Sequence, residues 1–374
     1  MPSSTETALP LHKMPISADE LTPDLLNAII RPWHKEVTVT EATVLNRSVF
    51  GDGMVSTAAR ATVALGYDAA SPPGLPERIV FKLTRDADTF IGPVYANEVR
   101  FYNLLRPELD DIETPISLGG AYDPKTEQFG LILGDLTLNG AEFPNVLDEN
   151  SVAQVEAVLD ALARLHARYW QSKQFGTDLA WVETHLQGPL SEFMYGPVTQ
   201  LVAYEAVHEK FKRELLERIS GTPERLLAMQ RLLHQHQATL PQTLLHGDAH
   251  IGNTFRYPDG RAGLLDWQLF VRGHHMHDVA YTITSALSTG TRRAKERELV
   301  AYYLDRLRSY GVEEAPSLEQ SMVEFGRTLV WCLTIGWLTV PLINYGWEIT
   351  LLNHLRIVAA YEDHQTENLI AEIG

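Results

Sequence analysis

The sequence of 374 residues has one cysteine, no apolar stretch long enough to span a bilayer, and no excess of basic residues. A lone Cys332 cannot form an intramolecular disulfide, which excludes a disulfide framework and favours a reducing compartment. The apolar run at residues 329–343 is too short for a membrane span, so it predicts a core helix and no membrane insertion. The N-terminus lacks a basic segment followed by an apolar one; no secretory signal is therefore expected, and the cytoplasm is the expected location.

The charge of the chain is strongly one-sided. It has 48 acidic and 31 basic residues, a formal net charge of −17. This balance gives no basic surface for nucleic acid, so nucleic acid is not expected as a partner, and neutral or cationic small molecules are favoured. The length and the 45% hydrophobic content suit two domains with their own cores, and they leave the oligomeric state open.

The expected elements divide the chain into a sheet-rich part and a helical part. Residues 22–30 are typical of a helix with Thr22 as N-cap and Pro23 as its first residue. Strand patterns follow, at residues 37–50, 56–65, 78–83, 114–122 and 129–136. We therefore expect an α+β fold with three regions: a tail and helix (1–35), a small antiparallel-sheet lobe (36–135) and a larger helical lobe (136–374).

Three segments of the helical part have strong patterns. Ser151 and Gln154 form a capping box ahead of an apolar stripe, which predicts a helix from that point. Further helices are expected at residues 292–310 and 318–339. Aromatic residues near the C-terminus either pack in the core of these helices or line a substrate pocket. They are Trp331, Trp337, Tyr345, Trp347 and Tyr361.

A lysine and a glutamate stand out in the sheet-rich part. In the strand at residues 78–83, the period of two places Ile79 and Phe81 on the core face and Lys82 on the opposite face. In the segment after Pro93, apolar residues recur at helical spacing, and this spacing places Glu98 on the packed face of a helix. An unpaired buried carboxylate is costly, so Glu98 is expected to have a cationic partner.

The sequence NTFRYPDGRAGLLDW predicts a hairpin. Asp259-Gly260 is a strong two-residue turn signal, and this turn places Asn253 directly opposite Asp266, with Cβ atoms about 4.5–5.5 Å apart. A three-residue loop would leave the two side chains diagonal, still within reach of a shared ion. An amide oxygen and a carboxylate suit a hard cation such as Mg²⁺. Asp248 lies upstream in the same loop, where it could accept a proton from an incoming hydroxyl.

These residues resemble a known catalytic loop. The pattern His-x-Asp-x-x-x-x-Asn, followed by an apolar strand that ends in Asp, is the layout of kinases, and here it comprises His246, Asp248, Asn253 and Asp266. The HGD form, together with LLDW and HDVAYTI, resembles the aminoglycoside phosphotransferase and choline kinase-like superfamily. NEVRFYNLL, LGDL and RLHARYW are similar to its ecdysteroid kinase-like branch. The resemblance covers about residues 37–283 and implies a bilobal, protein-kinase-like fold.

The resemblance implies a reaction and its catalytic residues. The reaction is transfer of the γ-phosphoryl group of ATP to a hydroxyl of a small organic molecule. Asp248 would be the catalytic base, and Asn253 and Asp266 the Mg²⁺ ligands. His246 and Asp278 would brace the loop through hydrogen bonds.

The resemblance also implies an ATP-binding set in the sheet-rich part. Lys82 would bind the α- and β-phosphates and form an ion pair with Glu98. Gly51 and Gly53 would form the turn over the phosphates, and the backbone from Gly134 to Leu136 would hold adenine.

Some features depart from protein kinases and leave alternatives open. Ser56 stands where a protein kinase has its third glycine, and no Ala-Pro-Glu follows, so a protein substrate is not favoured. The acceptor could be an aminoglycoside, a choline-like alcohol, a sterol or a sugar. A nucleotide-binding pseudokinase without turnover is an alternative. A metal-dependent hydrolase is a further one, based on a histidine group that comprises His274, His275 and His277 near His246 and His250.

Overall fold

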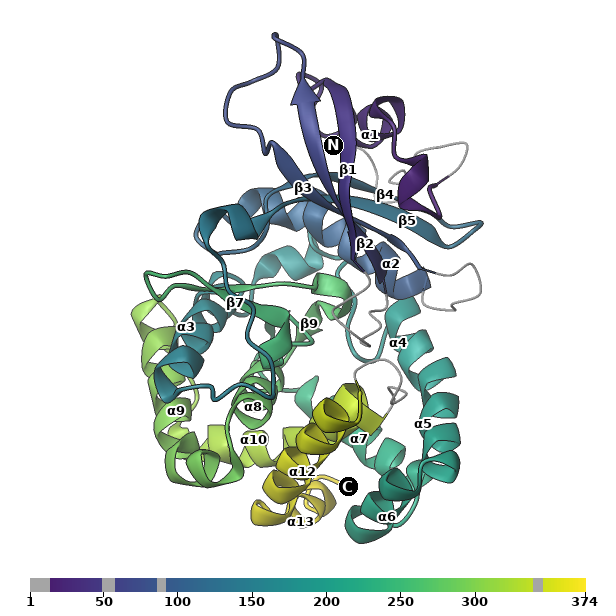
Figure 1. Cartoon of the computed structure of the whole chain (residues 1–374). Coiled ribbons are helices and arrows are strands. Elements are labelled where there is room, and N and C mark those ends of the chain that lie inside the picture. The colour runs from purple at the N-terminus through teal and green to yellow at the C-terminus, as the bar shows by residue number, and fades with distance from the viewer. Residues whose placement is uncertain (1–13, 49–57, 86–91, 339–345) are drawn as a thin grey trace. The chain divides into compact units, whose positions relative to one another are not determined.

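The chain folds into two compact units (Figure 1). The structure is a computed structural model that describes residues 14–48, 58–85, 92–338 and 346–374. Residues 1–110 and 114–141 form the sheet unit, and residues 111–113 and 142–374 form the helical unit. The predicted α+β class, with an antiparallel sheet early in the chain and a mostly helical remainder, is confirmed.

The sheet unit contains one five-stranded antiparallel sheet in the order β1-β2-β3-β5-β4. Its strands are β1 (Val39–Ser48), β2 (Ala58–Tyr67), β3 (Arg78–Thr84), β4 (Ser117–Asp123) and β5 (Gln128–Gly134). Its α-helices are α1 (Pro23–Ile30) and α2 (Gly92–Arg100). A π-helical turn (Phe101–Leu105) continues α2, and 3-10 turns cover Ala18–Glu20, Arg106–Glu108 and Leu136–Asn139.

Both faces of β3 are covered, which determines where Lys82 lies. Ile79 and Phe81 are fully buried in a core cluster that includes residues of α1, as their alternation predicts. Lys82 points to the opposite face, but it is only 3% exposed. Helix α2 contacts β4 and β5, the strands beyond β3, and supplies the partner of Lys82. The lysine is therefore a buried residue and not an ordinary exposed strand residue.

The helical unit is built from α-helices and short strand pairs. Its α-helices are α3 (Val152–Arg168), α4 (Pro189–Tyr195), α5 (Pro197–His208), α6 (Lys210–Ile219), α7 (Pro223–Gln237), α8 (Met276–Ala286), α9 (Thr289–Ser309), α10 (Leu318–Leu333), α12 (Trp347–Asp363) and α13 (Thr366–Ala371). Its strands are β6 (Thr243–Leu245), β7 (Thr254–Arg256), β8 (Ala262–Leu264) and β9 (Val271–Gly273), paired as β6 with β9 and β7 with β8. Short 3-10 turns cover Lys173–Gly176, Ile251–Asn253 and Trp267–Leu269, and a π-helical turn covers Thr334–Leu338.

The boundaries of the predicted helices agree with their capping residues. The capping box of Ser151 and Gln154 starts α3, as expected. Helix α9 begins three residues before the predicted position because the side chain of Ser288 accepts a hydrogen bond from the Thr291 backbone and caps it. The predicted third helix is α-helical only as far as Leu333 and continues as a π-helical turn to Leu338.

Helix α8 lies at the centre of the helical unit. All of its residues from Met276 to Ala286 are buried, and it contacts α3, α9, α10 and α12. Of the aromatic residues named above, Trp331 and Tyr361 are buried and Trp347 is 47% exposed. The side chains of Trp337 and Tyr345 lie outside the described part of the structure. No helix in the described part of the chain combines the length and the apolar character needed to cross a membrane.

Candidate active site

The sheet unit contains a buried ion pair. Lys82 Nζ on β3 donates to Glu98 Oε1 on α2 at 2.6 Å and to Oε2 at 2.8 Å. Glu98 is 0% exposed, so this contact supplies the cationic partner that its place on the packed helix face requires. The pair fixes the ammonium group at the face of β3 that α2 covers.

The end of β5 holds the segment predicted to bind adenine. The backbone N–H of Gly134 donates to the Ile116 carbonyl at 2.8 Å, and the N–H of Asp135 donates to the Arg78 carbonyl at 3.1 Å. Both N–H groups are therefore already used in hydrogen bonds within the sheet unit. Leu136 begins a 3-10 turn, where the first backbone N–H groups have no partner within the helix. The predicted phosphate-loop residues Gly51 and Gly53 lie outside the described residues.

The predicted catalytic loop of the helical unit is organised around the carboxylate of Asp278 on α8. Its Oδ2 accepts from the backbone N–H of His246 at 2.7 Å, and its Oδ1 accepts from the N–H of Gly247 at 2.9 Å. His166 Nε2 on α3 lies 3.1 Å from Oδ2, and His166 Nδ1 lies 2.8 Å from the Tyr303 hydroxyl. A carboxylate only accepts, so His166 Nε2 donates to Asp278, and in the neutral ring Nδ1 accepts from the Tyr303 hydroxyl.

The backbone at Gly247 needs a glycine. Its φ is +81°, and a Cβ there would collide with the carbonyl oxygen of Leu269. An L-residue would therefore be strained and would displace the neighbouring chain. The resulting turn directs the loop from β6 into Asp248.

His246 braces the loop from the other side. Its Nε2 lies 2.7 Å from the Leu265 carbonyl, and its Nδ1 accepts from the backbone N–H of Asp248 at 3.3 Å. A carbonyl only accepts, so the proton resides on Nε2. Burial lowers the pKa of His246 below its ordinary value, which keeps the ring neutral and suited to this pair of bonds.

Asp248 and Asn253 meet across the loop. The side-chain amide nitrogen of Asn253 donates to Asp248 Oδ2 at 2.9 Å and to the Asp248 carbonyl at 3.0 Å. Because the amide nitrogen is used in this way, the amide oxygen is the atom that Asn253 offers to a cation.

The predicted register of the hairpin is wrong by one residue. Thr254 pairs with Leu264, and Tyr257 N donates to the Arg261 carbonyl at 2.8 Å, so the loop comprises residues 258–260. Gly260 has φ +90°, the left-handed residue that closes a three-residue hairpin loop. Asn253 therefore lies opposite Leu265, and Asp266 is diagonal to it, the arrangement expected for a three-residue loop.

The electrostatics of the loop fit a bound cation. Burial raises the pKa of Asp248 well above its ordinary value, and the carboxylates of Asp266 and Asp278 raise it further, while the Asn253 hydrogen bond opposes them. Gathering carboxylates in a partly buried place is unfavourable unless positive charge offsets them. The amide oxygen of Asn253 and the carboxylate of Asp266 are oxygen ligands of the kind that Mg²⁺ takes, so the residues present fit this ion.

Two residues of this network were not predicted from the sequence. His166 contacts the carboxylate of Asp278, and Tyr303 contacts His166, although the two residues lie 112 and 25 positions from Asp278 along the chain. His166 occurs in the RLHARYW segment, on the apolar stripe of α3, and it is 0% exposed. A histidine on the packed face of an amphipathic helix requires a buried partner, and this is the signal that could have identified it.

Comparison with known proteins identifies the family. The sequence model of the ecdysteroid kinase-like family matches residues 51–311. The chain belongs to the ecdysteroid kinase-like family. This membership confirms the predicted relation to the aminoglycoside phosphotransferase and choline kinase-like superfamily.

Solved structures support the fold of this family member. A choline kinase from Cryptosporidium parvum Iowa II has a TM-score of 0.52 at 13% identity, over 91% of this chain and 92% of that chain. An ethanolamine kinase from Plasmodium vivax has a TM-score of 0.51 at 12% identity, over 92% of this chain and 86% of that chain. At such identities the likeness shows a common fold. A comparison with curated proteins gives no match.

Proposed function

We propose that the protein is a phosphotransferase that moves the γ-phosphoryl group of ATP to a hydroxyl of a small organic molecule. The observation that carries this proposal is the catalytic loop: Asn253 binds the Asp248 carboxylate, and Asp278 holds the backbone directly before it. Family membership and the fold shared with a choline kinase and an ethanolamine kinase point to the same class of acceptor, a small alcohol.

In this proposal Asp248 is the catalytic base. Its carboxylate takes the proton of the acceptor hydroxyl while the oxygen attacks the γ-phosphorus, and the β–γ bridging oxygen leaves with ADP. The bonds from Asn253 and the backbone of the loop fix the direction from which the carboxylate meets the hydroxyl.

Asn253 and Asp266 would hold Mg²⁺ through an amide oxygen and a carboxylate oxygen. When bound, the ion supplies positive charge that neutralises the phosphate oxygens. Lys82 would bind the α- and β-phosphates, with Glu98 keeping the ammonium group in place. The backbone N–H of Leu136 is the candidate donor to adenine, because those of Gly134 and Asp135 are already bonded.

The acceptor can be found with the full-length protein. A panel of aminoglycosides, choline-like alcohols, sterols and sugars would be screened for stimulated ADP release in the presence of Mg-ATP. We expect at least one of these classes to stimulate release. If nucleotide binds but none of the compounds is phosphorylated, a pseudokinase is the better description.

The role of Asp248 is tested with the acceptor so identified. Asp248→Asn should lower kcat by about 10²–10⁴-fold and leave the Kd for Mg-ATP, measured by calorimetry, close to that of the wild type. Asp305→Asn is the matched control, because Asp305 is exposed on α9 and bonds only to Arg308 among the described contacts. Wild-type turnover in the Asp248→Asn variant would show that another group is the base.

A further inference from the structure

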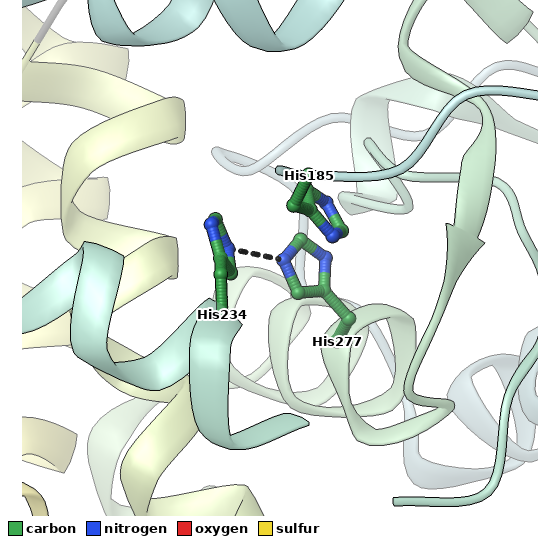
Figure 2. Close-up of side chains that lie close together, drawn as sticks. All are labelled: His185, His234 and His277. Atoms are coloured by element: carbon green, nitrogen blue, oxygen red, sulfur yellow. Dashed lines mark hydrogen bonds between the residues drawn. The ribbon is translucent and has the colours of Figure 1, made fainter. Parts of the chain in front are cut away.

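A second group of histidines gathers in the helical unit from three separate segments (Figure 2). His185 lies in the segment before α4, His234 is on α7, and His277 is on α8. One ring nitrogen from each residue can be chosen so that all three lie within 4.8 Å of one another. These three residues are called the histidine cluster below.

Two members of the cluster already have the spacing of metal ligands. His277 Nε2 lies 3.4 Å from His234 Nε2, as the dashed line in Figure 2 marks. Two nitrogens bound at about 2.0–2.1 Å to a tetrahedral Zn²⁺ would be about 3.4 Å apart. The His185 ring instead stacks on His234, with centroids 4.2 Å apart and planes at 19°. Its ring would therefore rotate to direct a nitrogen at the same point.

The protonation of the cluster suits a cation. Burial lowers the pKa of His185 to about 4, and burial lowers the pKa values of His234 and His277 well below their ordinary value. All three rings are neutral at pH 7, the form in which imidazole binds a metal. Each then offers a lone pair without first losing a proton.

Tyr195 determines which nitrogen of His234 faces the cluster. Its hydroxyl lies 2.6 Å from His234 Nδ1, and burial raises the pKa of Tyr195 to about 12, so the phenol stays protonated. If Nδ1–H donates to the Tyr195 oxygen, the lone pair of Nε2 points towards His277. Metal-binding histidines commonly have such a hydrogen-bond partner on the second nitrogen.

The surroundings leave room for a further ligand. A cavity of about 10 Å³ adjoins the cluster, lined in part by His185, Ser191, Tyr195, His234 and Trp331. That volume is close to the space one water molecule needs. His277 Nδ1 is buried with no hydrogen-bond partner among the described residues. Buried polar atoms without partners are uncommon, and this nitrogen is available to a metal ion or to a water molecule.

We propose that His185, His234 and His277 bind one transition-metal ion of the zinc class, with a water molecule as the fourth ligand. Imidazole nitrogens favour Zn²⁺, Cu²⁺, Ni²⁺ and Co²⁺ over Mg²⁺. The site is separate from the oxygen ligands Asn253 and Asp266 and does not depend on the proposed phosphotransfer. Bound metal ties α7 and the segment before α4 to α8, the helix that carries Asp278.

The cluster differs from the histidine group that the sequence suggests. Of His274, His275 and His277, only His277 belongs to it, and its partners His185 and His234 are 92 and 43 positions away in the chain. The His275 ring stacks on Tyr303 at 5.6 Å between centroids. His246 belongs to the catalytic loop instead.

The test uses full-length protein without a polyhistidine tag, freed of metal with a chelator and titrated with Zn²⁺ alone. We expect one Zn²⁺ per chain with a Kd of about 1 μM or tighter, and a Tm several degrees higher in the metal-bound protein. Co²⁺ bound in place of zinc should give the visible absorption of a four-coordinate site.

Variants identify the ligands. His185→Gln should weaken Zn²⁺ binding at least about 100-fold, and Tyr195→Phe, which removes only the outer hydrogen bond, about 10–100-fold. His185 is partly exposed, so its replacement is the least disruptive to folding. His236→Gln is the matched control, because His236 is on α7 but bonds to Glu324.

Two results would overturn the proposal. One is wild-type protein that binds no Zn²⁺ in the micromolar range. The other is a folded His185→Gln variant, verified by circular dichroism, whose Kd for Zn²⁺ equals that of the wild type.

Discussion

Each unit buries one carboxylate that matters to the proposed function, and the two units satisfy it differently. Glu98 in the sheet unit is 0% exposed and is paired with the ammonium group of Lys82. Asp278 in the helical unit is 1% exposed and accepts from two backbone N–H groups and a histidine. The first carboxylate is neutralised by a cation, and the second is solvated by hydrogen-bond donors.

The difference matches the task of each residue. An ion pair holds an ammonium group in one place, where its charge can also attract a phosphate. Hydrogen bonds to backbone N–H groups instead fix the chain itself, because both donors belong to the loop that carries Asp248. We infer that Glu98 positions a charge and that Asp278 positions a backbone.

Breaking the ion pair should have the largest effect. Lys82→Met leaves the Glu98 carboxylate buried without its cation and should lower the free energy of unfolding by about 3–5 kcal/mol. The double variant Lys82→Met/Glu98→Leu should recover most of this loss but not the affinity for Mg-ATP. Urea unfolding and nucleotide titration measure the two quantities.

An exposed ion pair provides the control for this prediction. Lys210 and Glu214 on α6 have exposed fractions of 78% and 59%, so Lys210→Met should leave the unfolding midpoint unchanged. A double variant as unstable as Lys82→Met alone would argue that packing, and not unpaired charge, accounts for the loss.

The second prediction concerns Asp278. Asp278→Asn exchanges one acceptor oxygen for an NH₂ group, which leaves a backbone N–H of the loop facing another donor. A buried donor without a partner costs about 1–3 kcal/mol, so we expect a loss of about 2–3 kcal/mol in urea unfolding. Turnover should fall as well, because the loop that carries Asp248 is no longer held by both hydrogen bonds to Asp278.

Asp123 is a useful comparison for Asp278. It accepts from Lys125 N and the Thr126 hydroxyl, but in an exposed turn where water can replace either bond. Asp123→Asn should therefore change stability little. Equal losses in the two variants would contradict the special role of the buried hydrogen bonds.

The smallest effect is expected at the hairpin, the part of the proposed catalytic loop that Asp278 does not hold. Gly260→Ala places an alanine at φ +90°, where a Cβ meets no other atom within 4 Å, so only backbone strain results. That strain is about 1 kcal/mol. Differential scanning calorimetry should show a slightly lower Tm with catalysis retained; lost turnover would mean that the turn also sets the geometry of Asn253 and Asp266.

Local patterns in the sequence predict much of the fold. Thr22 and Ser151 mark helix starts because a capping side chain acts on backbone groups within three residues. The pairing of Lys82 with Glu98 follows from the strand and helix periods together with the family pattern. The burial of Lys82 could not be predicted from the sequence. The alternation of apolar and polar residues along a strand shows on which face a residue lies, but it does not show what covers that face.

The site is less predictable where distant segments meet. The hairpin register depends on a single choice, whether Gly260 ends a two- or a three-residue loop, and the dipeptide Asp-Gly is compatible with both. His166 and the histidine cluster are contacts between helices far apart in the chain, for which one sequence contains no spacing rule. Such residues become visible only once the helices are packed.

Asp266 lies between β8 and the 3-10 turn at Trp267–Leu269, with φ +59° and ψ +68°, in the left-handed region. Aspartate and asparagine tolerate this conformation better than other residues with a Cβ. Alanine at this position would alter the backbone and the charge at once, so its effect could not be assigned to either. Asparagine keeps the main-chain conformation and removes only the carboxylate, which makes Asp266→Asn the informative choice in any mutational scan of this loop.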